Sequence, residues 1–113
     1  MDSILNSIKK LLGITEEQTD FDTDIIIHIN TTLTILNELG VGPEEGFVIE
    51  DASATWDDYI TDRRKFDKIK TYVYLKVRLY FDPPQNSSHA EAIKQQISEL
   101  EWRMNVTAEN QTE

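Results

Sequence analysis

Apolar residues recur along the chain at the spacing of amphipathic helices, and the pattern predicts four of them. The first lies at the N-terminus and ends at Gly13, a residue suited to a helix C-terminus. The second runs from Asp20 or Asp22 to Leu39, and its many β-branched residues mean that packing must keep it helical. The expected buried positions are Ile4, Leu5, Ile8, Leu11 and Leu12, then Ile25, Ile26, Ile29, Leu33 and Leu36.

The third predicted helix, about Arg64 to Phe81, carries two adjacent apolar stripes and is therefore expected to be the central one. Pro83 stops it, because proline disfavours helical geometry in the residue before it. The fourth opens with the capping box Ser88–Glu91. The first stripe of the third helix is Phe66, Ile69, Val73, Val77 and Tyr80, and the second is Tyr72, Leu75 and Leu79. The expected inner face of the fourth helix is Ile93, Ile97, Leu100 and Met104.

Residues 40–62 are predicted to form a loop-rich insertion between the second and third helices. Phe47-Val48-Ile49 is a candidate short strand, and Thr55 can cap a single helical turn. After Val106 the chain is polar, which predicts a flexible tail over residues 107–113. The sequence thus predicts a mainly α fold: one compact bundle of about four helices over residues 1–106.

Composition narrows the class of protein. At 113 residues the chain suits one domain with a single core. It has no cysteine, which excludes disulfides and thiolate metal sites. Its apolar runs are too short to span a bilayer, and its N-terminus has no secretion-signal pattern, so no membrane partner is expected.

Charge is unevenly distributed along the chain. Residues 1–62 contain fourteen acids and two lysines, a net charge of −12, and residues 79–113 carry −4. Between them, residues 63–78 carry seven Lys or Arg and one Asp, a net charge of +6. Opposite charges on separate parts of one chain are typical of a subunit that contacts copies of itself or a partner.

Candidate catalytic and metal sites are weak. Asp20-x-Asp22-x-Asp24 begins like a calcium loop, but Ile25 and Thr31 stand where Gly and Glu are required. These acids more simply complement a helix N-terminus. His28 and His89 are the only histidines, and no pattern pairs them. We therefore expect no enzyme activity, no catalytic or metal-binding residues and no cofactor.

Two other functions stay open at this point. The basic residues 63–78 could serve a small helical DNA-binding or regulatory protein, although a pI near 4.5 argues against a phosphate-gripping surface. A mobility-shift assay over a salt series would separate that function from assembly. A metal-dependent hydrolase using the carboxylate pairs 44–45, 50–51 and 57–58 is remote, because no nucleophile or phosphate-binding loop accompanies them.

Several strings resemble the head–tail connector (adaptor) proteins of tailed bacteriophages and prophages. They are SIKKLLGIT, NELGVGP, ATWDDYI and, most specifically, KTYVYLKVRLYFDPP followed by a helix ending in EWRMNV. The resemblance implies a helical subunit of the virion neck, assembled in the host bacterial cytoplasm as a ring of twelve copies under the portal protein. Such a ring extends the DNA channel, lets DNA pass without specific binding, and docks a tail-side stopper or tail-completion protein.

The resemblance and the charge pattern together suggest roles for particular residues. The expected subunit interface pairs Arg63, Arg64, Lys68 and Lys70 with a neighbour's Asp57, Asp58 or Asp62. Trp56 and Tyr59 fit either the core or an interface. The expected portal-binding residues are Trp102, Arg103, Met104, Asn105 and Val106, and the loop 40–54 is expected to face the tail-side partner.

Overall fold

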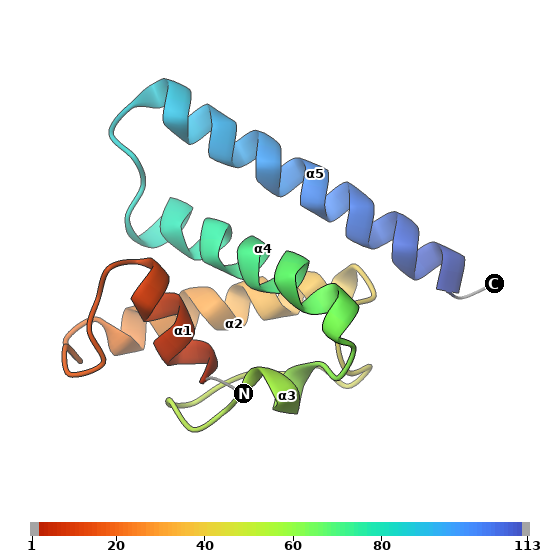
Figure 1. Cartoon of the computed structure of the whole chain (residues 1–113), viewed down its shortest axis with the longest axis horizontal. Helices are drawn as coiled ribbons and strands as arrows, with labels where there is room; N and C mark the ends of the chain where they lie inside the picture. Colours follow the sequence, from red (N-terminus) through yellow and green to blue (C-terminus); the bar gives the residue numbers. More distant parts are fainter. Residues whose placement is uncertain (1–2, 112–113) are drawn as a thin grey trace.

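A computed structural model describes residues 3–111, apart from the side chains of Arg63 and of residues 107–111. The described residues form five helices around one core (Figure 1). These are α1 (Ile4–Leu11), α2 (Asp22–Glu38), α3 (Trp56–Tyr59), α4 (Arg63–Phe81) and α5 (Ser87–Gln111). The predicted mainly α fold is confirmed. Within this range residues 47–49 form no strand, and the sole isolated bridge joins Ser3 to Thr55.

Helix α4 is central, as its two apolar stripes predict. It packs most extensively on α2, next on α5, and also touches α1. Figure 1 shows α4 crossing in front of α2 while α5 runs along its other side. The core is built from the inner faces of these helices: Ile4, Leu5, Ile8, Ile25, Ile29, Leu33, Leu36, Ile69, Tyr72, Val73, Leu75, Val77, Ile93, Ile97 and Met104.

Side chains at the helix starts fix the boundaries. The Ser3 hydroxyl accepts from Asn6 N at 3.2 Å, and Thr55 and Asp58 form a reciprocal capping box on α3. The predicted capping box Ser88–Glu91 does not open α5, because the helix begins about half a turn earlier. The Asn86 carboxamide oxygen accepts from Ser88 N at 2.8 Å, so Asn86, itself a strong capping residue, starts the helix earlier.

Two predicted core positions are also wrong. Tyr80 is 52% exposed and stacks on His28 with ring centroids 5.9 Å apart. It lies in the last turn of α4, where its ring reaches the flank of α2 rather than the core. Leu11 is exposed at the last residue of α1, beyond the region that α2 and α4 cover.

Helix α5 continues to Gln111, past the predicted boundary at Val106. Its backbone is thus helical through most of the segment assigned to a polar tail. The side chains from residue 107 onward lie outside the described part, so the flexibility of that tail stays a prediction.

Lys9 is buried and joins α1 to the start of α2. Its ammonium lies 2.8 Å from Asp22 Oδ1 and donates to the carbonyls of Gln18 and Glu16 at 2.7 and 3.2 Å. Two carbonyls thus accept hydrogen bonds from the ammonium and the Asp22 carboxylate balances its charge, which together offset the cost of burying a lysine. This contact fixes the link from residue 12 to residue 21, and with it the position of α2.

Candidate assembly surface

One side of α4 carries several exposed or partly exposed residues, most of them basic. Arg64, Lys68 and Thr71 are exposed, and Arg78 is partly exposed further along. The helical repeat places all four on the side opposite Ile69, Val73 and Val77 of the core, and buried Leu75 interrupts this side between Thr71 and Arg78. We call this surface, Arg64, Lys68, Thr71 and Arg78, the cationic strip.

Arg64 already has a carboxylate partner within the protomer. Asp62 caps α4 by accepting from Arg64 N at 2.9 Å, and its two oxygens lie 3.2 Å from the Arg64 guanidinium. These bonds hold the pKa of the Asp62 carboxyl below its usual range and raise the pKa of Arg64. Among the predicted interface residues, Arg64 and Asp62 are therefore brought together inside one chain.

Three other cations of α4 contact aromatic groups instead of carboxylates. Lys70 lies over the Phe66 ring at 5.7 Å, Lys76 lies over the Tyr80 ring at 5.3 Å, and Arg78 donates to the Tyr74 hydroxyl at 3.1 Å. Lys68 is exposed, and within the described residues it forms no ion pair. Among the described side chains of α4, Arg64 is thus the one cation paired with a carboxylate.

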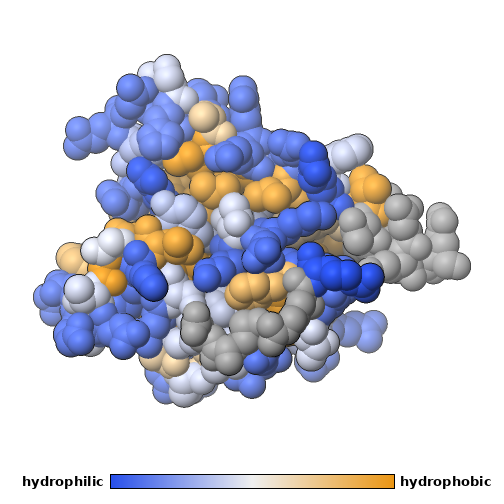
Figure 2. Space-filling model, in the orientation of Figure 1, coloured by the Kyte–Doolittle hydropathy of each residue, from blue (hydrophilic) through white to orange (hydrophobic). Residues whose placement is uncertain are grey.

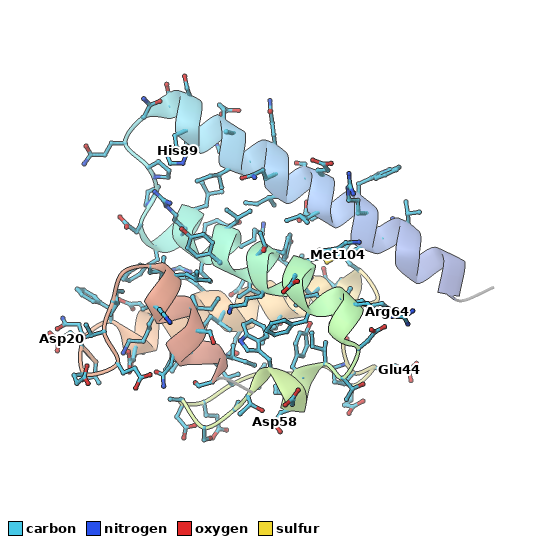
Figure 3. The ribbon with its side chains drawn as sticks, viewed as in Figure 1. Asp20, Glu44, Asp58, Arg64, His89 and Met104 are labelled. Carbon is cyan, nitrogen blue, oxygen red and sulfur yellow. The ribbon has the colours of Figure 1, made fainter. Side chains whose placement is uncertain are left out.

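The predicted acidic partners lie on α3 and at the start of α4. Asp58 is engaged locally, since it accepts from Thr55 N at 2.9 Å, and Asp57 is exposed beside it. Figure 3 shows Arg64 and Glu44 at the end of the molecule where α4 begins, Asp58 along the adjacent edge, and Asp20 at the opposite end. The side chain of Arg63, also predicted here, lies outside the described residues.

Trp56 and Tyr59 belong to the interior of the protomer. Trp56 is fully buried, donates to Ser7 Oγ at 3.2 Å and meets the Phe66 ring edge-on. Tyr59 is almost fully buried, and burial raises the pKa of its hydroxyl, which has no hydrogen-bond partner among the described residues. Of the two roles left open, this burial favours the core.

The predicted portal-binding residues divide by the side of α5 on which they lie. Met104 is buried in the core of the protomer. Trp102 is 67% exposed on the side facing away from α4. Arg103 pairs with Glu99 at 2.8 Å, Asn105 is exposed and Val106 is half-buried. Trp102 is thus the main apolar group that this end of α5 presents.

The sequence reasoning missed a second exposed surface, on the outer side of α2. Ile27 is 55% exposed there, and Val48 of the following loop is 60% exposed. The signal was present, because no Asp, Glu, Lys or Arg lies between Asp24 and Glu38. In an acidic chain, an uncharged run of this length is longer than one buried stripe requires.

Figure 2 shows the other side of the molecule, on which α4 lies. Apolar side chains line the seam between α4 and α5 there.

Over residues 3–111, no group of three His, Cys, Asp or Glu could hold a metal ion, and no helix is long and apolar enough to cross a membrane. A small helical domain with opposite charges on separate parts of its surface is typical of a subunit that binds copies of itself or a partner. A family model described as "Phage connector protein" matches residues 4–111. The chain therefore belongs to the phage connector protein family. Searches of curated proteins and of solved structures found no match.

Proposed function

We propose that this structural phage protein is a head–tail connector (adaptor) subunit of the virion neck. Copies form a ring under the portal protein, extend the channel for DNA and dock the next tail component. Family membership over residues 4–111 supports the connector role. The ring, its partners and assembly in the host cytoplasm are our proposal, with twelve copies adopted from the resemblance.

The observation that carries the ring is the cationic strip. Its Lys68 has no carboxylate partner among the described residues, while residues 1–62 carry a net charge of −12. Two different, complementary surfaces on one protomer support a heterologous interface, which closes into a ring when its rotation divides a full turn. Opposite charges at such an interface favour encounter and correct register.

The net charge of −10 fits a channel for DNA. A predominantly acidic wall repels phosphates, so the duplex can pass without adhering. The proposed role needs no catalysis, since the protein acts by joining other components. We assign the portal contact to the end of α5, with Trp102 as its apolar anchor, and the tail-side contact to the loop 40–54.

Charge reversal on the cationic strip tests the proposal. Lys68→Glu should leave the fold unchanged, because the side chain is exposed, yet it should sharply reduce the yield of rings on portal-bearing heads. Lys94→Glu is the matched control: it makes the same change at another exposed site, on α5. Circular dichroism establishes folding, and electron microscopy counts rings. Equal ring yields for both variants and the unmodified chain would contradict the proposal.

A further inference from the structure

We propose, building on the ring function above, that the outer side of α2 is the surface that receives the cationic strip of a neighbouring copy. The receiving surface consists of Ile27, Thr31 and Thr34 of α2 together with Val48 of the next loop, and we call it the α2 face. The acidic residues of the interface would then be those around the α2 face, in place of residues 57–62 expected from the sequence.

The α2 face is exposed and low in polarity. Thr31 Oγ1 donates to the carbonyl of Ile27, and Thr34 Oγ1 donates to the carbonyl of Asn30, each at 3.0 Å. Both hydroxyl donors are therefore used within the helix. The outer side of α2 thus presents one large apolar side chain, Ile27, beside two uncharged threonines. Its own chain leaves this side uncovered.

Val48 is held beside this helix. The Asn30 side chain accepts from Ile49 N at 2.8 Å and donates to Ile49 O at 3.0 Å, which anchors residues 47–49 to α2. Val48, with Phe47 and Gly46, lines a hollow shared with Thr34 and Asn37. The loop and the helix consequently form one continuous surface rather than two separate exposed side chains.

The charges around the α2 face identify the kind of partner. Asp24, Glu38, Glu45 and Glu50 are exposed on α2 and the adjoining loop, and no Lys or Arg occurs between Lys10 and Arg63. An apolar centre with an acidic surround is best covered by cations on long aliphatic stems. The stems pack on apolar groups while the charged heads reach the acids. The cationic strip of a second copy has this chemistry.

The two surfaces also face in opposite directions. Helices α2 and α4 bury their inner sides against each other, with Ile29 and Leu33 on one helix and Val73 and Val77 on the other. Their outer sides must therefore point away from each other, in keeping with the front and back positions of α4 and α2 in Figure 1. An interface between opposite sides of one protomer is head-to-tail and leaves both end copies able to bind another.

Cysteine cross-linking tests this pairing cleanly, because the chain has no cysteine of its own. Thr31→Cys marks the α2 face, Thr71→Cys marks the cationic strip, and Gln95→Cys marks an exposed control site on α5. Full-length variants, one of each pair labelled with ¹⁵N, are mixed at high concentration and on portal-bearing heads. A short bis-maleimide then links neighbouring thiols, and mass spectrometry counts the mixed dimers.

We expect the Thr31→Cys and Thr71→Cys mixture to give mixed dimers in severalfold excess over either variant alone and over Thr31→Cys with Gln95→Cys. The excess should disappear at high salt and when Lys68→Glu is added to the Thr71→Cys chain. The inference would be overturned if mixed dimers were no more frequent than in the control pair. It would also be overturned if Thr31→Cys linked mainly to itself, or if Lys68→Glu left the linking unchanged. If rings still require Lys68 while this pair fails to link, the ring function stands and the α2 assignment alone is wrong.

Discussion

Replacing Lys9 by Met should destabilise the protein far more than the same change at the neighbouring Lys10. Lys9 is 1% exposed, and its ammonium donates to two carbonyls and forms an ion pair with Asp22, whereas Lys10 is exposed. Methionine retains most of the apolar stem of lysine, so the Lys9→Met variant chiefly removes the charged group. It leaves Asp22 and the carbonyls of Glu16 and Gln18 without their shared donor.

The size of the effect follows from the burial of the two partners. Removing one member of a buried ion pair costs about 3–5 kcal/mol when the other charge stays buried. Asp22 is 25% exposed, and Glu16 and Gln18 lie on the surface, so water can partly replace the ammonium. We therefore expect the free energy of unfolding to fall by about 2.5 kcal/mol. For a chain of this length, that corresponds to a fall of about 10 °C in Tm.

Urea unfolding followed by circular dichroism measures the loss, and Lys10→Met should change stability by less than about 0.5 kcal/mol. A double-mutant cycle with Asp22→Asn isolates the coupling between the two side chains. If Lys9→Met unfolds at the same urea concentration as Lys10→Met, the buried ammonium does not hold α1 to α2, and our account of the α2 position is wrong.

Two further predictions concern α5 and the turn after α2. Tyr72→Phe removes the 2.6 Å hydrogen bond from the Tyr72 hydroxyl to Glu101. It should lower the free energy of unfolding by about 1.5 kcal/mol and speed hydrogen exchange in α5. Unchanged exchange would contradict this prediction. Burial and the hydrogen bond to Glu101 raise the pKa of the Tyr72 hydroxyl. Its contribution to the free energy of unfolding is therefore complete below the unfolded pKa of about 10 and declines as pH rises further. The variant should lose this alkaline dependence of stability. Gly42→Ala should destabilise more than Gly46→Ala. Both glycines have φ near +90°, but only at Gly42 would a β-carbon lie 2.6 Å from Tyr59 Cε1; equal denaturation midpoints would refute the clash.

The helices could be predicted because their signals are local. The cap at Thr55, the glycine after α2 and the prolines after α4 each act within a few residues, and all fall where expected. The start of α5 was misplaced because Asn86 and Ser88 are both good caps two residues apart. Sequence alone does not decide between them.

Long-range features could not be predicted in the same way. Lys9 occupies an apolar position of α1, but its acceptors come from residues 16–22, whose path is set only by the tertiary fold. The pairing of Arg64 with Asp62 likewise depends on how the chain enters α4. Tyr80 shares the helical phase of the core, yet it lies in the last turn of α4, where it remains exposed. In each case the helical periodicity indicates the side of the helix on which a residue lies. The packing of other parts of the chain determines whether that residue is buried and which groups it contacts.

The central claim is that the cationic strip binds an acidic surface of the next copy. Cryo-electron microscopy of the protein assembled on portal-bearing heads tests it most directly. We predict a closed ring in which Lys68 and Arg78 of each subunit lie within ion-pair distance of carboxylates on its neighbour. A ring whose strip faces only solvent, with no protein chain against it, would contradict the claim.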